Sequence, residues 1–232
     1  MSPLKKKSSS SGFSLLELLI AMAITMVLVT AAVTLLASGL RMRTRENQKS
    51  DALADTQRAL NIMSREIANA GFNLNNNGIV TTDSGPNKIR VRSNTNKYEV
   101  DNGSLNNISR NNVGEEEEDI TYFLNEAENT KYLVRHDEFG SGSTVLANRI
   151  DSLNIYYFDR KVTYTVPSGG AGSDITNFSS PQVSKENAKY IVIAISVTLD
   201  AVGTPGSDGY QPGHSVLLCS DVTLRNWDLR FY

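Results

Sequence analysis

Three residues near the start of the chain have the types and spacing that proteolytic processing would use. Gly12 precedes Phe13, and Glu17 stands at the beginning of an uncharged run from Leu18 to Leu40. An acid one turn inside an apolar helix costs a few kcal/mol, roughly 2.5–3.5 for the comparable Asp, so Glu17 needs a compensating group. Cleavage after Gly12 would supply one, because the new amine of Phe13 would be a cation near this acid. The glutamate of a neighbouring copy could form an ion pair with that amine in the same way.

The uncharged run is long enough to cross a membrane as a helix. Its 23 residues would extend about 34 Å, which exceeds the thickness of the bilayer's hydrocarbon. Basic residues flank the run on both sides, so charge alone does not fix its orientation. They are Lys5, Lys6 and Lys7 before it, and Arg41, Arg43 and Arg45 after it. We expect the arginines to meet lipid headgroups or neighbouring subunits.

Two simpler interpretations of this segment explain less. A secretory signal peptide would account for the lysines, and Ala37-Ser38-Gly39 resembles a small-residue cleavage site. Its apolar region should be about 7–15 residues, however, and this one is longer and holds an acid. An uncleaved membrane anchor accounts for the length but leaves Glu17 unexplained. Both interpretations stay as alternatives.

The basic leader, Gly12, Phe13, Glu17 and the apolar run together resemble the class III signal of type IV pilins and type II secretion pseudopilins. The resemblance implies that a prepilin peptidase cleaves after Gly12 and methylates the new N-terminus at Phe13. It also implies that Glu17 supports methylation and assembly into a helical filament, and that the leader lies in the cytoplasm.

Outside this segment the sequence offers little catalytic chemistry. His136 and His214 are the only histidines and lack a metal-ligand spacing. No nucleophile elbow, P-loop or dinucleotide-binding fingerprint is present, and the glycine-rich stretch 168–172 is interpreted as a linker. The acidic run 115–119 has the oxygen density of a Ca²⁺ site but lacks the alternating pattern of a dedicated loop, which favours a solvated charged loop. We therefore expect no enzyme activity, cofactor or metal.

Composition bounds the remaining possibilities. The formal net charge is −2 at pH 7, and loss of the three leader lysines would bring it to −5, so we expect no nucleic-acid partner. Cys219 is the only cysteine, which rules out an intramolecular disulfide, and its apolar neighbours indicate a small buried residue of a strand. The 232 residues suffice for a membrane helix and one globular domain.

The helix is predicted to continue beyond the apolar run. Apolar residues recur there at helical spacing and share one face: Leu53, Leu60, Met63, Ile67 and Ala70. Gly71 is a suitable C-terminal stop. No proline occurs between Pro3 and Pro86, so a single helix over residues 13–70, about 87 Å long, is allowed. Small residues in its first half would let helices approach closely: Ala21, Ala23, Ala31, Ala32, Ala37 and Gly39.

After a polar loop over residues 73–87, the pattern changes to the alternation of β-strands. Hairpin turns are expected at 101–103 and 125–130, a bend or break within 145–158, and a mobile segment over 167–188. The expected strands are 89–92, 98–100, 119–124, 131–135, 145–158, 161–166 and 190–199, with one or two more within 216–231. A long helix followed by an antiparallel sheet is an α+β architecture, in which the helix's apolar face completes the core of the sheet.

Several later segments resemble PilW-type minor pilins, and the J-type minor pseudopilin of type II secretion is a close relative. The segments are 58–72, 120–124, 133–135 and 222–226. The resemblance implies four parts. They are a leader peptide at 1–12, a transmembrane and filament-core helix at 13–40, an amphipathic continuation at 41–72 and a β-rich pilin domain at 73–232.

The function that this resemblance implies is that of a minor type IV pilin. It would be inserted in the inner membrane with its C-terminal domain outside the cytoplasm, and then help to prime pilus assembly for adhesion, twitching motility or DNA uptake. The expected partners are other minor and major pilins, contacted through the N-terminal helix, the prepilin peptidase, the inner-membrane assembly platform and a tip adhesin. Two alternatives stay open: a minor pseudopilin of type II secretion, and a membrane-anchored binding module whose helix is only a tether.

Overall fold

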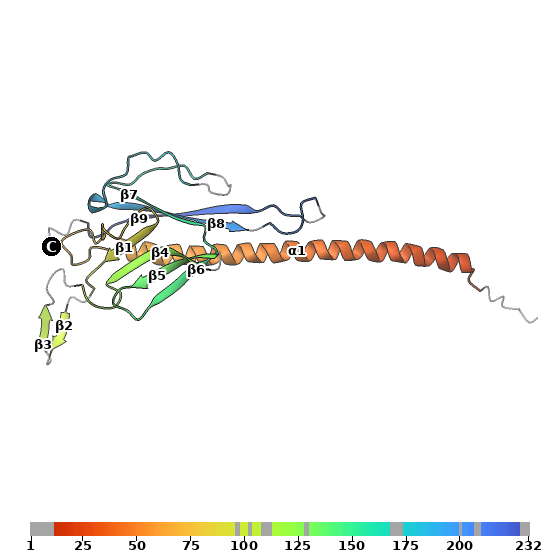
Figure 1. Ribbon diagram of the computed structural model, residues 1–232, viewed down its shortest axis with the longest axis horizontal. Helices are drawn as coiled ribbons and strands as arrows, with labels where there is room; N and C mark the ends of the chain where they lie inside the picture. Colours follow the sequence, from red (N-terminus) through yellow and green to blue (C-terminus); the bar gives the residue numbers. More distant parts are fainter. Residues whose placement is uncertain are drawn as a thin grey trace, which may run out of the picture.

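One long helix, α1 (Leu15–Ala68), dominates the structure (Figure 1). The computed structural model describes residues 12–95, 98–101, 104–107, 113–127, 130–167, 174–199, 201–206 and 210–227. Over its 54 residues α1 extends about 81 Å at the standard rise. The predicted unbroken helix is confirmed, and it begins and ends two residues inside the expected range 13–70. Residues 1–11 of the expected leader lie outside the described residues.

Both ends of α1 have local causes. Ser14 is extended, and its carbonyl accepts the first helical hydrogen bond, from the amide of Leu18 at 3.2 Å. At the other end, Gly71 has a φ of +79°, in the left-handed region that favours glycine, so the chain turns away there. The expected stop at Gly71 therefore lies three residues beyond the last helical residue, Ala68.

Two antiparallel sheets flank the C-terminal half of α1 (Figure 1). One has the strand order β1-β4-β5-β6 and the other β7-β8-β9, while β2 and β3 form a hairpin of their own. A short 3-10 helix, η1 (Lys185–Asn187), precedes β8. The strands are β1 (Lys88–Arg92), β2 (Tyr98–Asp101), β3 (Ser104–Asn107), β4 (Asp119–Ala127), β5 (Thr130–Asp137), β6 (Ser143–Asn148), β7 (Ser152–Phe158), β8 (Tyr190–Leu199) and β9 (His214–Thr223). This arrangement confirms the α+β architecture.

The strongest strand predictions are confirmed. In β1, Ile89 and Val91 are buried while the residues between them are half-buried, as alternation predicts. The predicted strand 190–199 is β8, which lies in the middle of its sheet and is almost entirely buried. The hairpin of β2 and β3 is also observed, although residues 102 and 103 of its predicted turn lie outside the described residues.

Three strand predictions need correction or refinement. The stretch 145–158 is broken: β6 and β7 belong to different sheets, and Arg149 between them has a φ of +60°. The hairpin predicted across 125–130 is confirmed as β4 and β5, but its connection is shorter than expected, because the pairing continues to Ala127 and Thr130. The expected strand 161–166 is wrong, since this segment makes only an isolated bridge between Thr165 and Thr176.

The segment expected to be mobile, 167–188, is anchored to β7 at some of its described residues. The ring centroid of Phe178 lies 4.7 Å from that of Tyr156 and 5.1 Å from that of Phe158, and the amide of Val183 donates to the carbonyl of Tyr157 at 2.9 Å. Ile175 is also buried, while several other described residues of this segment are exposed. The remainder, 168–173, lies outside the described residues. Of the one or two strands predicted within 216–231, β9 is observed, and it ends at Thr223; residues 228–232 are likewise outside.

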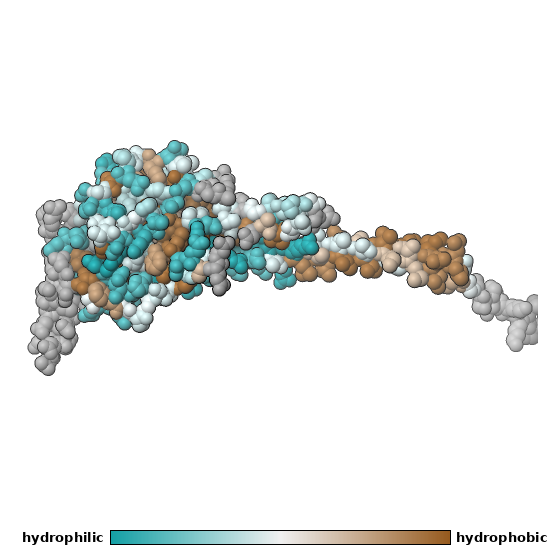
Figure 2. All heavy atoms as spheres, in the orientation of Figure 1, coloured by the Kyte–Doolittle hydropathy of each residue, from teal (hydrophilic) through white to brown (hydrophobic). Residues whose placement is uncertain are grey.

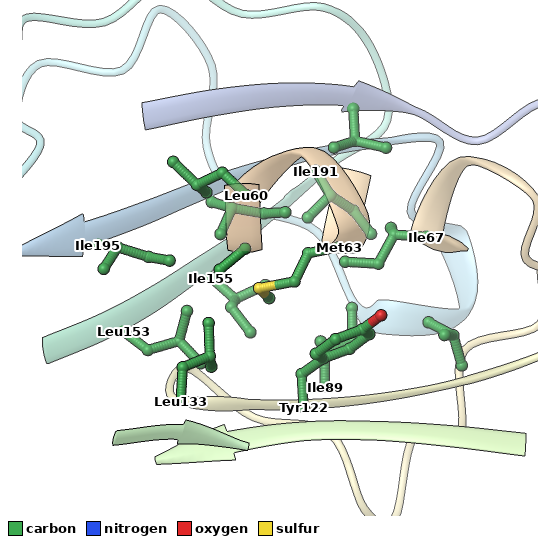
Figure 3. Packing of buried hydrophobic residues seen from close by; sticks show 14 of the residues in the cluster. Leu60, Met63, Ile67, Ile89, Tyr122, Leu133, Leu153, Ile155, Ile191 and Ile195 are labelled. Carbon is green, nitrogen blue, oxygen red and sulfur yellow. The ribbon is translucent and has the colours of Figure 1, made fainter. Parts of the chain in front are cut away.

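The apolar face of α1 completes the core between the two sheets (Figure 3). Leu60, Met63 and Ile67 are at most 1% exposed, which confirms the predicted helix face. Burial of each such side chain contributes roughly 1.5–3 kcal/mol. Leu53 is only half-buried, because Ala52 and the residues at helical spacing from it face the sheets instead.

Polar contacts fix the orientation of α1 on the sheets. The buried hydroxyl of Tyr122 on β4 donates to the carboxylate of Glu66, and Arg135 Nε on β5 lies 3.0 Å from the same carboxylate. Burial, together with the charge of Glu66, raises the pKa of Tyr122, so its hydroxyl stays a donor. On the other sheet, the hydroxyls of Ser64 and Ser220 lie 2.7 Å apart.

Candidate processing and assembly site

The predicted cleavage point lies in accessible chain just before α1. Gly12, Phe13 and Ser14 have no regular structure and are exposed, and the Phe13 side chain is 83% exposed. A Cβ atom added at Gly12 would meet no atom within 4 Å. The peptide bond between Gly12 and Phe13 is therefore open to a protease, and the glycine is not required by the fold of this chain.

Glu17 lies in the first turn of α1, because the helix begins at Leu15. The first amide groups of a helix lack partners within it and carry the positive end of the helix dipole, so a carboxylate there gains about 0.3–1 kcal/mol. Sequence reasoning missed this contribution because it placed the helix start at Phe13. The gain is smaller than the roughly 2.5–3.5 kcal/mol that an acid costs within a membrane. A further partner is still needed, and the amine created at Phe13 would be the nearest cation.

The rest of this half of α1 is apolar and uncovered (Figure 2). Its large apolar side chains, from Leu15 to Leu40, are all more than half exposed. Of the described residues, only those of α1 form a helix long and apolar enough to cross a membrane. The small residues expected at helix contacts, from Ala21 to Gly39, belong to this same uncovered surface; Ser38 alone among residues 12–40 is half-buried.

Hydroxyl groups within the apolar half are satisfied by the helix itself. Thr30 Oγ1 donates to the carbonyl of Met26 at 2.8 Å, and Ser38 Oγ donates to that of Thr34 at 3.0 Å. Thr25 and Thr34 make equivalent bonds to their own helix. These side chains therefore need no external partner in an apolar environment. Glu17 is the only ionisable side chain among residues 12–40.

The other candidate residues are not gathered into a site. His136 lies on β5, where its Nδ1 atom is 3.0 Å from Ser143 Oγ, and His214 begins β9 in the other sheet. Cys219 lies in β9 as predicted but is half-buried rather than buried. Burial raises the pKa of its thiol to about 11, with a smaller contribution from Asp221, so the thiolate is scarce at neutral pH.

The acidic run 115–119 is only in part the solvated loop that was expected. Residues 115–117 are exposed, but Glu118 and Asp119 are at most 2% exposed. The Glu118 carboxylate accepts hydrogen bonds from the backbone amides of Thr95 and Gly114. The Asp119 carboxylate accepts hydrogen bonds from two arginines of β1. Both acids therefore have structural partners in the fold.

The arginines that follow the apolar run differ from one another. Arg41 and Arg43 are exposed, as expected for residues that meet lipid or other subunits. Arg45 is instead buried against its own domain, where its Nη2 atom donates to the carbonyl of Pro212 at 2.6 Å.

Comparison with known proteins identifies the N-terminal segment. A family model described as the prokaryotic N-terminal methylation motif matches residues 7–33, which include Gly12, Phe13 and Glu17. No curated protein and no solved structure matches the chain. The motif stands at the start of a helix that is able to cross a membrane and that packs on antiparallel sheets. The N-terminal segment of this chain thus carries the methylation motif of type IV pilin-like proteins, whose precursors a prepilin peptidase processes.

Proposed function

We propose that this chain is a non-enzymatic structural subunit, a PilW-type minor pilin of a type IV pilus. Cleavage after Gly12 and methylation of Phe13 produce the mature subunit, which assembles through the apolar half of α1. One observation carries this proposal. The helix is divided into a half that its own domain covers and a half that is exposed and holds a single acid, Glu17.

Assembly follows from the energetics of that exposed half. In the membrane, lipid covers the apolar side chains; in a filament, the helices of other subunits do so. The new amine of Phe13 and the carboxylate of Glu17, from the same or a neighbouring subunit, neutralise each other at low dielectric, where their attraction is strong. An unpaired carboxylate in the bundle is penalised, so the pair favours one axial register between subunits.

The proposed location and partners rest on the methylation motif and the resemblance to minor pilins, and the exposed apolar half of α1 supports a place in a membrane. The subunit is held in the inner membrane with its β-rich domain outside the cytoplasm, and it then enters the pilus at the cell surface. There it primes assembly together with other minor and major pilins, the assembly platform and a tip adhesin. Adhesion, twitching motility and DNA uptake are the processes that such a pilus supports.

The replacement Glu17→Val tests the pairing. We expect the variant to insert into the membrane normally, because valine is apolar, but to be recovered from sheared filaments at about one tenth of the wild-type level or less. The tenfold figure corresponds to the loss of about 1.4 kcal/mol of assembly free energy. The matched control is Asp51→Val, which removes an exposed acid of the same helix beyond the apolar run. Equal recovery of Glu17→Val and wild type would refute the pairing.

The cellular fraction in which the protein is found separates the remaining possibilities. A pilus subunit is expected in purified extracellular filaments, whereas a membrane-anchored binding module would stay in the membrane fraction. A pseudopilin of type II secretion would be absent from pili, and its deletion would block secretion instead of piliation. Either of these results would overturn the pilus assignment while leaving the processing site intact.

A further inference from the structure

A cavity of about 300 Å³ lies where the loop between β8 and β9 meets α1. Its walls come from one turn of the helix and from both ends of that loop: Arg45, Glu46, Lys49, Leu199, Gln211 and Pro212. The loop is held in place by a pair of backbone hydrogen bonds between Val202 and Gln211, at 2.9 and 3.0 Å. This pairing fixes the adjacent carbonyl of Pro212, which receives the hydrogen bond from Arg45.

The guanidinium of Arg45 is incompletely satisfied. The residue is only 9% exposed, and its Nη2 atom donates to the Pro212 carbonyl at 2.6 Å. Its Nη1 atom is buried and has no hydrogen-bond partner. A buried charged group without a counter-ion is costly, and arginine is always charged in proteins. An anion in the adjoining cavity would offset this buried charge.

The charges around the cavity favour an anion. Lys49 lies one helical turn after Arg45 and is half-buried, and Arg41 lies one turn before it and is exposed, so three cations follow one helix face. Glu46 is the only acid in the cavity wall, and it is exposed to solvent. The three cations outnumber this one acid, so the net formal charge of the four side chains is positive.

The position of the cavity along α1 indicates the source of the anion. Arg45 lies five residues beyond Leu40, where the apolar run ends, which is about 7.5 Å along the helix. The headgroup layer of a bilayer extends roughly 5–8 Å beyond the hydrocarbon. Of the described parts of the domain, the segment that follows β8 reaches furthest toward the apolar half of α1 (Figure 1). When that half spans the membrane, the cavity stands at the level of the lipid phosphates.

We propose that this cavity binds the phosphate of an anionic phospholipid headgroup, with Arg45 as the main donor and Lys49 as the second cation. The planar guanidinium suits phosphate oxygens, and Arg45 and Lys49 both line the cavity. Bound lipid would hold the β-rich domain at a fixed height above the membrane before assembly. The proposal rests on insertion of α1 in a membrane and does not require filament formation.

The test uses the full chain in detergent micelles and native mass spectrometry to count bound phospholipid. The probes are phosphatidylglycerol, diacylglycerol, which lacks the phosphate, and inorganic phosphate. We expect phosphatidylglycerol to bind and diacylglycerol not to bind. Arg45→Gln should weaken phosphatidylglycerol binding about tenfold or more, the loss of a charge-assisted contact. The matched control, Arg43→Gln, changes an exposed arginine outside the cavity and should weaken binding much less than Arg45→Gln does.

Each alternative result is decisive. Equal losses for Arg45→Gln and Arg43→Gln would mean unspecific attraction to basic charge and would overturn the site. Binding of inorganic phosphate with no preference for the lipid would overturn the lipid as its source. Arg45→Lys keeps the charge but lacks the planar guanidinium, so this variant should bind phosphatidylglycerol with intermediate affinity. Circular dichroism of each variant checks that the domain is folded. Absence of the expected lipid binding, with normal cleavage after Gly12 and normal recovery in pili, would contradict the lipid site but not the proposed function.

Discussion

At the scale of single residues, Asp119 shows how a buried charge is held in this domain. Its side chain is fully buried at the start of β4, and Arg90 Nε and Arg92 Nε each lie 2.7 Å from one of its oxygens. Burial alone would raise the pKa of Asp119, but the hydrogen bonds from these two arginines outweigh it and hold the pKa below its ordinary value of 3.8. Because the folded pKa is the lower one, this stabilisation is present above about pH 4 and is lost as the pH falls through the folded value.

We therefore predict a pH-dependent effect of Asp119→Asn. At pH 7 the variant should lose about 2–3 kcal/mol of unfolding free energy, because the two arginines lose a charged acceptor. The difference from wild type should shrink as the pH falls from about 4 toward the folded pKa of Asp119, because the carboxyl of the unfolded chain is protonated first. Urea unfolding of the full chain in detergent across this pH range measures it. Glu116→Gln, at an exposed position, serves as the control, and a difference that does not change with pH would contradict the prediction.

The buried acids Glu118 and Asp119 also show what the local sequence could not reveal. The run 115–119 has the composition of a solvated loop, yet Glu118 and Asp119 are buried. The arginines that compensate Asp119 precede it by 27 and 29 residues and reach it only because β1 pairs with β4. In contrast, Gly12, Phe13 and Glu17 lie close together in the sequence, so the candidate processing site can be recognised from the sequence alone.

At the scale of elements, the junction between α1 and β1 depends on glycine. Gly78 has a φ of +79°, and a Cβ atom there would overlap the amide nitrogen of Gly71 and the carbonyl oxygen of Arg92. Both of these groups are already engaged: the Gly71 amide donates to the Arg92 carbonyl at 2.9 Å. The end of the helix and the first strand thus meet through backbone, without room for a side chain.

Gly78→Ala is accordingly predicted to destabilise the domain by about 3 kcal/mol or more. Backbone strain at positive φ contributes roughly 1–3 kcal/mol, and overpacking against rigid backbone contributes a similar amount. Gly85→Ala is the matched control, because a Cβ at Gly85 would meet nothing within 4 Å, and it should change stability by less than about 0.5 kcal/mol. Thermal or urea unfolding compares the two. If the Gly78→Ala protein were as stable as Gly85→Ala, the junction would have room for a side chain and the prediction would be contradicted.

Most elements follow from periodicity, and the misses have physical causes. The apolar spacing in α1 and the unbroken run of β8 are strong local signals, and both elements are observed as expected. The segment 174–188 was misjudged because its polar composition hides Phe178, whose contacts lie on β7 and are distant in sequence. The cavity at Arg45 was missed for the same reason, since Pro212 is 167 residues away along the chain.

At the scale of the whole molecule, the helix joins two environments. Its second half is covered by the two sheets, while its first half projects from the domain as an uncovered apolar rod (Figures 1 and 2). Such a surface is unstable in water and must lie in lipid or against other helices. Under the proposed function, a precursor held in the membrane and a subunit packed in a filament would satisfy this requirement in turn, and neutralisation of Glu17 would link the two states.

The central claim is that processing creates the partner of Glu17, and the N-terminus of the mature protein tests it most directly. Mass spectrometry of the N-terminal peptide, from protein made in cells with a prepilin peptidase, should show a chain that begins with N-methylated Phe13. Gly12→Val should retain the leader without loss of fold, because a Cβ at Gly12 meets no atom of this chain within 4 Å. A mature chain that begins at Met1, or after Gly39, would contradict the claim.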